Sequence, residues 1–264
     1  KPAGTSATTH ILKPQIGQLP NGIDLSNSVE NEYLCLKLLA ALGVPAAHTE
    51  IAEFGGRRTL IIERFDRRWT KDGRLLRLPQ EDICQALSVP PTRKYQPEGG
   101  PGMRDIIQLL KGSDTPEQDI ATFMRASILF WMLGATDGHA KNFSITLGPG
   151  GRFHLTPLYD VLTAQPSLDA GQIQQKKFKL AMSVGKNRHY LVDNIMPRHF
   201  LQTAELAGVG MPLMRILFEE IADTAVGRTD TVMASLPPGF PEQLIASVRK
   251  AVRQRTKLVA DAVA

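Results

Sequence analysis

The chain has 264 residues, 42% of them hydrophobic and 22% charged, a balance typical of a globular protein with one large or two moderate domains. Lys and Arg number 31 against 26 Asp and Glu, and the formal charge of +5 is a mild bias toward anionic partners such as ATP or nucleic acid. Two cysteines are too few for a disulfide framework, and no apolar run reaches the roughly eighteen residues of a membrane span. The N-terminus has no signal-peptide pattern, so we expect a cytoplasmic protein without a membrane partner.

The first predicted element is a short strand in THILKP, which contains Lys13. A loop rich in Pro and Gly follows over residues 14–27. Most lysines at strand ends are simply solvated, so Lys13 by itself does not indicate a site.

A helix is predicted from about Val29 to Leu42, with Ser28 as its N-cap. Glu30 and Glu32 lie in the first turn, where the helix dipole favours acidic side chains. The helical spacing assigns four residues to the core, namely Tyr33, Leu36, Leu39 and Leu42.

Two β-type runs, AAHTEIAEF and RTLIIERF, flank Gly55-Gly56 and predict a hairpin that ends near Asp66. QEDICQALSV is predicted to form one short helix, and KYQPEGGPG a loop without the glycine spacing of a phosphate-binding loop. Asp114-Thr-Pro-Glu117 has the pattern of a capping box and is expected to start a long apolar helix.

The stretch GATDGHAKNFS, which follows that helix, concentrates polar side chains. Asp137 can accept the proton of an attacking hydroxyl group. Asn142, together with Asp160 in the later string TPLYD, offers the oxygen ligands that Mg²⁺ prefers, with waters and phosphates completing the octahedron. Either His139 or Lys141 is a candidate to face the phosphates, so the stretch predicts a phosphoryl-transfer centre.

Spacing supports this grouping. Residues 143–147 and 152–156 flank the turn sequence GPGG and predict a hairpin. A hairpin returns the chain to its start, which brings Asn142 and Asp160 together although eighteen positions separate them. Asp and Asn also commonly cap and turn loops, and for Asp137 alone that structural role is an equal alternative.

Beyond Asp160, KKFKLAMSV predicts a strand and several amphipathic segments predict helices. A last helix is expected from Pro241 to about Val263, with Arg249, Arg253 and Lys257 on one face. Such a stripe can contact DNA phosphates, but it is more often a solvated face.

The chain resembles the HipA family of serine/threonine kinases, the toxins of bacterial toxin–antitoxin modules. The resemblance extends along nearly the whole chain, through TTHILKP, SVENEYLCLKLL, IIERFDRRW, LRLPQEDICQ, KYQPEGGPG, GATDGHAKNFS, LTPLYDV, KLAM and PRHFL. The shorter pattern of Asp137, His139 and Asn142 is also similar to the catalytic loop of aminoglycoside and other small-molecule kinases. The flanking strings narrow the resemblance to the HipA family.

The resemblance implies an α+β, bilobal protein-kinase-like fold. Residues 1–66 would be the remainder of a mixed upper lobe with antiparallel strands, ending in the hinge, and residues 67–264 a mostly helical lower lobe with the catalytic loop and metal site. Asp137 would be the catalytic base, and Asn142 and Asp160 would bind Mg²⁺. The residues implied to bind ATP are Lys13, Glu63, Phe65, His139, Asn142, Tyr159 and Asp160, with Glu32 a candidate partner of Lys13.

The function implied by the resemblance is ATP- and Mg²⁺-dependent phosphorylation of a serine on an aminoacyl-tRNA synthetase, such as the glutamyl enzyme, which arrests translation and growth. The implied partners are a HipB-like helix-turn-helix antitoxin and, through that complex, operator DNA. Family members carry a further N-terminal subdomain and a phosphate-covering loop with an autophosphorylated serine before the position of Lys13. This sequence starts after both, so we expect a longer chain or a separate partner to supply the lid.

Two other functions stay open on the sequence. A small-molecule kinase would phosphorylate a sugar or an antibiotic and need no antitoxin. A catalytically silent nucleotide-binding fragment would bind the antitoxin and act as a co-repressor on DNA. The absence of the lid favours the second alternative, whereas the intact residues Asp137, Asn142 and Asp160 argue against it.

Overall fold

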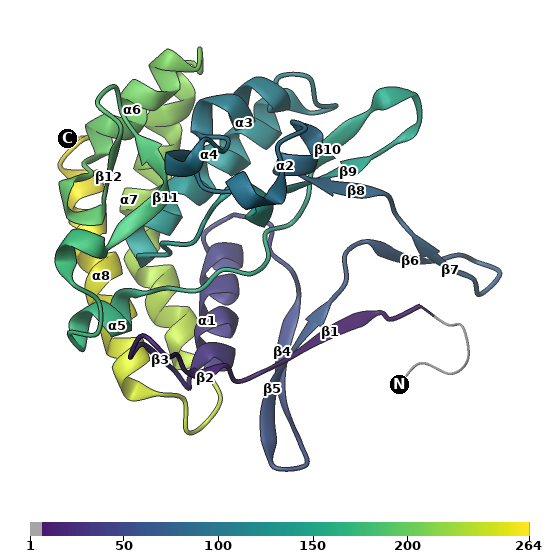
Figure 1. Cartoon of the computed structure of the whole chain (residues 1–264). Coiled ribbons are helices and arrows are strands. Elements are labelled where there is room, and N and C mark those ends of the chain that lie inside the picture. The colour runs from purple at the N-terminus through teal and green to yellow at the C-terminus, as the bar shows by residue number, and fades with distance from the viewer. Residues whose placement is uncertain (1–6, 264) are drawn as a thin grey trace.

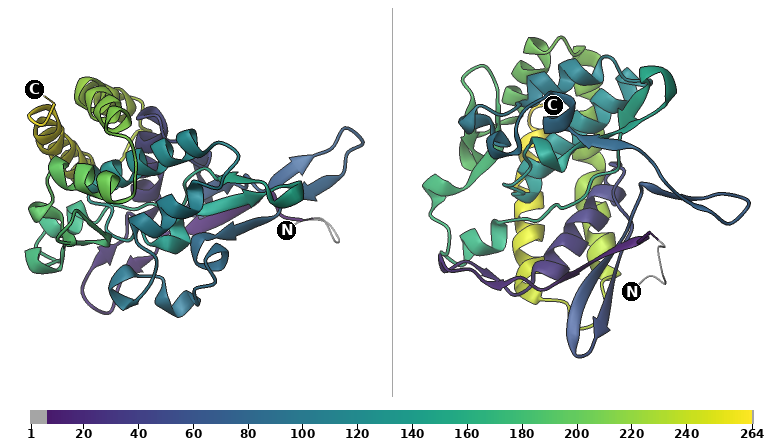
Figure 2. Two further views of the ribbon diagram at one scale, coloured as in Figure 1. Left: turned by 90° about the horizontal axis from the view of Figure 1, so that it is seen from above. Right: turned by 45° about the vertical axis from the view of Figure 1, so that its right-hand side comes forward.

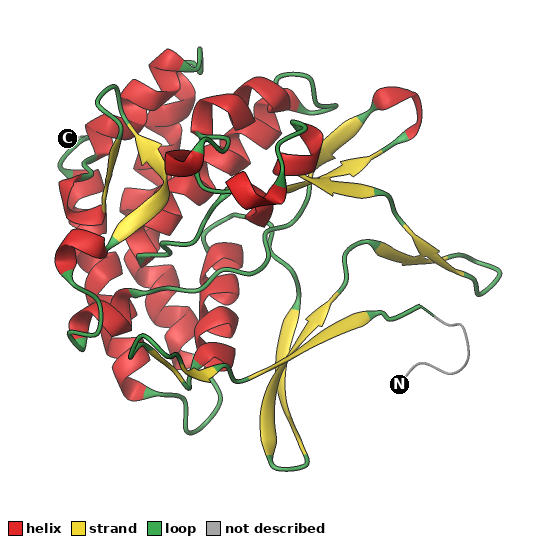
Figure 3. Cartoon of the chain, viewed as in Figure 1, coloured by secondary structure: helices red, strands yellow, loops and turns green. Residues whose placement is uncertain are grey.

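Strands and long helices occupy different parts of the protein, as the computed structural model of residues 7–263 shows (Figures 1 and 3). Residues 1–6 of the expected upper lobe, and residue 264, lie outside the described residues. A strand-rich part with a projecting hairpin lies at one side of the molecule, and the long helices lie at the other (Figure 2). The predicted α+β architecture with antiparallel sheets is confirmed.

All pairs between the named strands are antiparallel, in sheets ordered β1-β5-β4, β10-β9-β8, β11-β12, β2-β3 and β6-β7. The bounds are β1 (His10–Pro14), β2 (Gly17–Gln18), β3 (Asp24–Leu25), β4 (Thr49–Phe54), β5 (Arg57–Glu63), β6 (Arg67–Trp69), β7 (Leu75–Arg77), β8 (Gln80–Asp82), β9 (Ser144–Leu147), β10 (Phe153–Leu155), β11 (Lys179–Val184) and β12 (His189–Leu191).

The β4–β5 hairpin turns at Gly55 and Gly56, whose φ angles of 55° and 73° lie in the left-handed region that suits such turns. β1 pairs along the other edge of β5 and places Lys13 opposite Leu60. Both predicted elements, the strand with Lys13 and the hairpin, are confirmed.

The helices are α1 (Ser28–Ala41), α2 (Ile83–Ala86), α3 (Met103–Leu110), α4 (Pro116–Leu133), α5 (Gln165–Asp169), α6 (Pro197–Leu206), α7 (Met211–Ala234) and α8 (Glu242–Ala260). Two predicted helix starts were wrong. Asn27 is the N-cap of α1, because the Ser28 hydroxyl is used to accept a hydrogen bond from the Ile16 amide, 2.8 Å away. Thr115 is the N-cap of α4 and makes no side-chain cap, so the expected capping box is absent there.

α1 is buried on almost every side. Leu36, Leu39 and Leu42 are in the core as predicted, and Tyr33 is half-buried. Cys35 on the same helix is buried and free. α1 packs on β4 and β5 on one side and on α4 and α7 on the other, so it joins the strand-rich part to the helical body.

The basic stripe on α8 is largely engaged within the protein. Arg249 and Arg253 form ion pairs with Asp230 of α7 at 3.1 and 2.9 Å. Arg255 is buried and donates hydrogen bonds to Met132 O and Gln165 Oε1, both at 3.0 Å. In residues 7–263, no helix combines the length and the apolar character that crossing a membrane requires.

Candidate active site

The polar stretch after α4 forms a tight loop. Gly134 ends the helix with a φ of 70°, and a Cβ at this position would lie 2.8 Å from the ring of Phe178. The chain then turns into a 3₁₀ helix, η3 (Ala140–Asn142). The backbone amide of His139 donates to Asn142 Oδ1 at 3.2 Å, and the backbone amide of Asn142 donates to His139 O at 2.9 Å. These reciprocal bonds fix where Asn142 lies.

The β9–β10 hairpin brings the second half of the site back to this loop. Asn142 Nδ2 donates to Asp160 Oδ2 at 3.3 Å, so the predicted proximity of these two residues is confirmed. The segment before Asp160 is held beside β4, because the amides of Leu158 and Ala47 donate to Pro45 O and Leu158 O, each at 2.8 Å. Asp160 has a φ of 57°, a left-handed conformation that Asp tolerates better than most residues.

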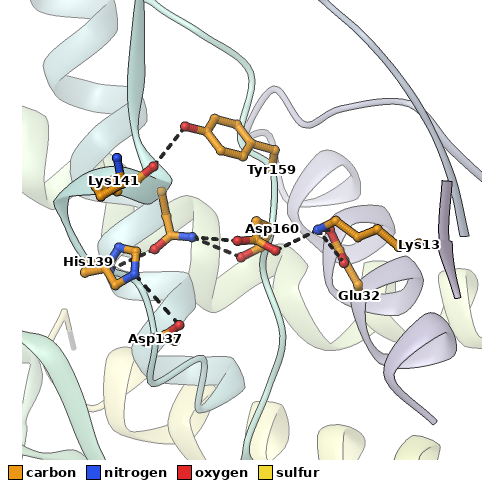
Figure 4. A network of polar contacts seen from close by, with 8 residues as sticks. Lys13, Glu32, Asp137, His139, Lys141, Tyr159 and Asp160 are labelled. Atoms are coloured by element: carbon orange, nitrogen blue, oxygen red, sulfur yellow. Dashed lines mark hydrogen bonds and ion pairs between the residues drawn. The ribbon is translucent and has the colours of Figure 1, made fainter. Parts of the chain in front are cut away.

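Lys13 lies between two carboxylates (Figure 4). Its Nζ is 2.8 Å from Glu32 Oε1 and 2.7 Å from Asp160 Oδ1. Burial lowers the pKa of Lys13, but the charges of Glu32 and Asp160 outweigh burial, and the net pKa is raised. For Glu32, burial raises the pKa more than Lys13 lowers it. The lysine is therefore protonated and in place to meet an anionic ligand.

A second link, which the sequence analysis missed, holds α1 beside Asp160. Asn31 Nδ2 donates to Thr163 O at 2.8 Å, and the Thr163 amide donates to Asn31 Oδ1 at 2.9 Å. Both residues are buried. Because Asn31 is next to Glu32, this pair fixes the distance between α1 and the segment that carries Asp160.

Lys13 and Asp160 border a cleft of about 300 Å³ between the β1–β5 strands and the segment that ends in Asp160. That volume is at the lower end of the range for small-molecule sites. The lining residues are Ile11, Lys13, Ile62, Glu63, Arg64, Phe65, Asp66, Gln80, Tyr159 and Asp160.

Phe65 and Tyr159 form one aromatic wall of the cleft, with ring centroids 5.8 Å apart. The Tyr159 hydroxyl donates to Lys141 O at 3.0 Å, and burial raises the Tyr159 pKa to about 12, so the phenol is neutral. The Glu63 side chain is 61% exposed and its amide already donates to His48 O, whereas the Phe65 amide has no acceptor among the described residues. Of these two residues, only Phe65 has a backbone amide that is free to donate to a ligand.

Asp137 lies in the same loop, two residues before His139, and its side chain is 67% exposed. The Tyr95 hydroxyl donates to Asp137 Oδ1 at 2.6 Å. The Tyr95 ring packs edge-on against His139, with centroids 5.0 Å apart. Burial lowers the pKa of His139, which is 5% exposed and lies 3.9 Å from Asp137 Oδ2.

Within residues 7–263, neither His139 nor Lys141, the two candidates for facing the phosphates, forms a side-chain hydrogen bond or ion pair with Lys13 or Asp160. His139 packs beside Tyr95 and Asp137, and Lys141 Nζ pairs with Asp82 Oδ2 at 2.6 Å. Tyr95 was missed by the sequence analysis, because it lies 42 positions before Asp137 in the loop KYQPEGGPG. The available signal was the aromatic residue in that otherwise Gly- and Pro-rich loop.

The donor set at Asn142 and Asp160 fits Mg²⁺ better than a soft metal. Within residues 7–263, no three His, Cys, Asp or Glu side chains form a cluster that would enclose an ion. One carboxylate, with a side chain 51% exposed, and one neighbouring amide suit an ion that keeps several waters and phosphate oxygens. The side chain of Asn142 turns its NH₂ group toward Asp160, while its Oδ1 accepts from the backbone amide of His139. For Asn142 Oδ1 and Asp160 to coordinate one metal ion together, the side-chain amide of Asn142 has to rotate away from that backbone amide.

Comparison with known proteins identifies the family. The model of the HipA-like C-terminal domain matches residues 2–232. The chain belongs to this HipA-like family. Y4mE of Sinorhizobium fredii, whose name proposes that it is a kinase, is 40% identical over 227 residues, which are 84% of this chain and 50% of Y4mE. The serine/threonine-protein kinase toxin HipA of Shewanella oneidensis is 30% identical over 194 residues, 69% of this chain and 41% of HipA.

Two solved structures share the fold of this chain. HipA of Shewanella oneidensis, in a complex with HipB and operator DNA, superposes with a TM-score of 0.82 at 22% identity, covering 98% of this chain and 61% of HipA. The Helicobacter pylori proinflammatory kinase CtkA superposes with a TM-score of 0.62 at 11% identity, covering 96% of this chain and 88% of CtkA. The expected kinase-like, HipA-like fold is confirmed, and the chain spans about half the length of the curated relatives above.

Proposed function

We propose that this chain is the nucleotide-binding and catalytic part of an ATP- and Mg²⁺-dependent serine/threonine protein kinase. The observation that carries the proposal is the placement of Lys13 against both Glu32 and Asp160. A lysine that pairs with a helix glutamate and lies beside a metal-binding aspartate is the arrangement that active protein kinases need. In this proposal residues 1–66 belong to the upper lobe and residues 67–264 to the lower lobe.

The roles follow from the contacts. Lys13 would hold the ATP phosphates, and Asp160 and Asn142 would hold Mg²⁺, which neutralises charge on the phosphates when it is bound. Phe65 and Tyr159 would contact the adenine, with the Phe65 amide as its hydrogen-bond donor and Glu63 preceding it in the hinge. His139 would stabilise the loop by packing against Tyr95 and would not contact ATP, because its ring is buried there.

Asp137 would orient the substrate hydroxyl group and accept its proton. Its carboxylate is exposed and Oδ1 already accepts a hydroxyl hydrogen bond, from Tyr95. General-base assistance of this kind contributes about 10²–10⁴-fold to a rate.

The biological role that we propose is that of a toxin kinase in the cytoplasm. The substrate would be an aminoacyl-tRNA synthetase, the glutamyl enzyme first, as the HipA family suggests. A HipB-like helix-turn-helix antitoxin would be the partner, reaching operator DNA through the complex. Membership of the HipA-like family and the relative named as a serine/threonine kinase toxin support this role.

The test is transfer of label from γ-labelled ATP to a panel of purified aminoacyl-tRNA synthetases in the presence of Mg²⁺. We expect label on the glutamyl enzyme, reduced about 10²–10⁴-fold by Asp137→Asn with unchanged ATP affinity. Label on a sugar or an aminoglycoside instead would establish a small-molecule kinase. ATP binding without transfer to any acceptor, even with the antitoxin gene product present, would favour the co-repressor.

A further inference from the structure

A second concave surface lies outside the nucleotide cleft. It has a volume of about 790 Å³, and its lining residues come from α3, α6, the β11–β12 turn and the loop that carries Tyr95. Figure 1 shows the position of these helices and strands, and α3, α6 and β11 contact one another. We call it the basic groove, defined by Gln96, Arg104, Lys111, Ser183, Lys186 and Arg188 among its lining residues. The basic groove shares no lining residue with the nucleotide cleft.

The charge of this groove is one-sided. Four cationic side chains line it, Arg104, Lys111, Lys186 and Arg188, and one carboxylate, that of Asp105. Asp105 Oδ2 is occupied, because it accepts a hydrogen bond from the Gly102 amide at the start of α3, 2.8 Å away. The groove therefore attracts an anionic ligand.

Two of the cations are available to that ligand. Lys186 pairs with Glu205 at 3.1 Å, and Arg188 donates to the Tyr190 hydroxyl at 3.1 Å. Arg104 and Lys111 are exposed and form no ion pair or side-chain hydrogen bond with any residue in 7–263. Arg104 lies in the first turn of α3 and Lys111 is its C-cap. Seven positions are about two helical turns, so both residues lie on the face of α3 that lines the groove.

The groove is connected to Asp137 through consecutive residues. The Tyr95 hydroxyl bonds to Asp137, and the next residue, Gln96, lines the groove and accepts a hydrogen bond from the Ser183 amide at 2.7 Å. The loop is folded closely on itself at Gly100, whose amide donates to Tyr95 O at 3.0 Å and where a Cβ would lie 2.1 Å from Arg93 O. A chain lying in the groove would thus contact the residue next to the tyrosine that bonds to Asp137.

We propose that the basic groove binds an acidic segment of the protein substrate and so leads its serine to Asp137, an inference that rests on the kinase function proposed above. A protein segment suits the groove better than single-stranded nucleic acid. None of the lining residues is aromatic, whereas grooves for single strands usually offer rings on which bases stack. Leu206, 40% exposed, gives the segment an apolar contact beside the charges.

The test measures binding without ATP, by fluorescence anisotropy of a labelled Glu-rich peptide that contains a serine. Arg104→Glu/Lys111→Glu should weaken its binding about tenfold or more, equal to about 1.4 kcal/mol. Lys176→Glu/Lys177→Glu is the matched control, because both lysines are exposed, lie outside the groove and give the same change of net charge. The control should bind the peptide like the unmodified protein.

Two further measurements separate this proposal from the kinase function. The unmodified protein and the two double variants should bind ATP with equal affinity. If none of the three bound ATP, that result would count against the kinase function but would leave the peptide result valid. In the transfer assay, the groove variant should raise KM for the protein substrate with little change in kcat. Equal peptide binding by the two double variants would overturn the proposal. It would also be overturned if a uridine-rich oligonucleotide bound more tightly than the peptide and if Arg104→Glu/Lys111→Glu abolished that binding.

Discussion

The two sides of the loop that carries Asp137 and Asn142 are built in different ways. The side proposed to bind the nucleotide is a continuous chain of charged and polar contacts between β1, α1 and the segment after β10, formed by Lys13, Glu32, Asp160 and Asn142. On the side proposed to receive the substrate, Asp137 is mostly exposed and is contacted by Tyr95 from a loop. The first side is preformed for a ligand of fixed shape, and the second leaves room for a hydroxyl group to enter.

The packing of α1 explains the preformed side. α1 shares one core with α4 and α7, and Arg228 of α7 donates to Ala41 O at 2.9 Å. Movement of Glu32 away from Lys13 would therefore have to disturb the core of the helical body. We infer that regulation by a shift of this helix is disfavoured, and that changes on the substrate side are less costly.

The largest effect predicted for ligand binding is on the proposed nucleotide side. Asp160→Asn should weaken Mg²⁺–ATP binding about 100-fold, or about 2.7 kcal/mol, because it removes the one carboxylate of the proposed metal site. Asn tolerates the left-handed backbone of Asp160, so the fold should persist. Calorimetry with Asp137→Asn as the control should show little change in affinity; equal losses in both variants would contradict the separation of the two sides.

The next effect concerns the loop that carries Tyr95. Gly100→Ala should lower the free energy of unfolding by about 1–3 kcal/mol, because the added methyl group meets the carbonyl oxygens of Arg93 and Tyr95 at 2.1 and 2.8 Å. Gly227→Ala is the control, since Gly227 lies in α7 and a Cβ added there would have no atom within 4 Å. The control should be neutral or stabilising by up to about 1 kcal/mol in urea unfolding.

A smaller effect is expected at the hydroxyl that touches Asp137. Tyr95→Phe should reduce phosphoryl transfer about tenfold, equal to about 1.4 kcal/mol, which is near the low end of the roughly 1.5–3 kcal/mol that a hydrogen bond to a charged group contributes. ATP affinity should stay the same, because Tyr95 lies outside the nucleotide cleft. Tyr33→Phe is the matched control. A faster Tyr95→Phe enzyme would instead show that this hydroxyl competes with the substrate for Asp137.

The features that local patterns could predict were found from the sequence. The β4–β5 and β9–β10 hairpins follow from turn residues between β-type runs, and the second hairpin correctly placed Asn142 beside Asp160. The spacing in α1 correctly predicted that Leu36, Leu39 and Leu42 are buried, but it did not predict the burial of the other faces, which carry Leu34, Cys35 and Leu38. In each case the signal lies within a short stretch of chain.

The missed features depend on partners distant in sequence. Asn31 meets Thr163 across 132 positions, and Tyr95 meets Asp137 across 42. The wrong N-cap at Ser28 has the same origin, because its hydroxyl bonds to Ile16 instead of its own helix. Side-chain partners of this kind are decided by packing of the whole fold, which local propensity does not describe.

The smallest predicted effect is the pH response of α6, which forms one wall of the basic groove. His199 Nδ1 accepts a hydrogen bond from the Met196 amide at 3.1 Å, which requires a neutral Nδ1, and its ring stacks on His189 at 3.9 Å. Burial lowers the pKa of His199, and the nearby His189 and Arg198 lower it further. Below about pH 6.5 the unfolded chain therefore binds more protons than the folded one, and stability falls as the pH decreases.

Replacing this histidine should remove that part of the pH response. Glutamine at the third helical position can accept the same amide hydrogen bond without titrating, so His199→Gln should flatten the decline. One proton changes the slope by at most about 1.4 kcal/mol per pH unit. Urea unfolding at about pH 7.5 and about pH 5.5 measures the difference, with the exposed His154→Gln as control. An unchanged slope in His199→Gln would mean that other groups dominate the pH dependence of stability. The wall of the basic groove that α6 forms would then not respond to pH through His199.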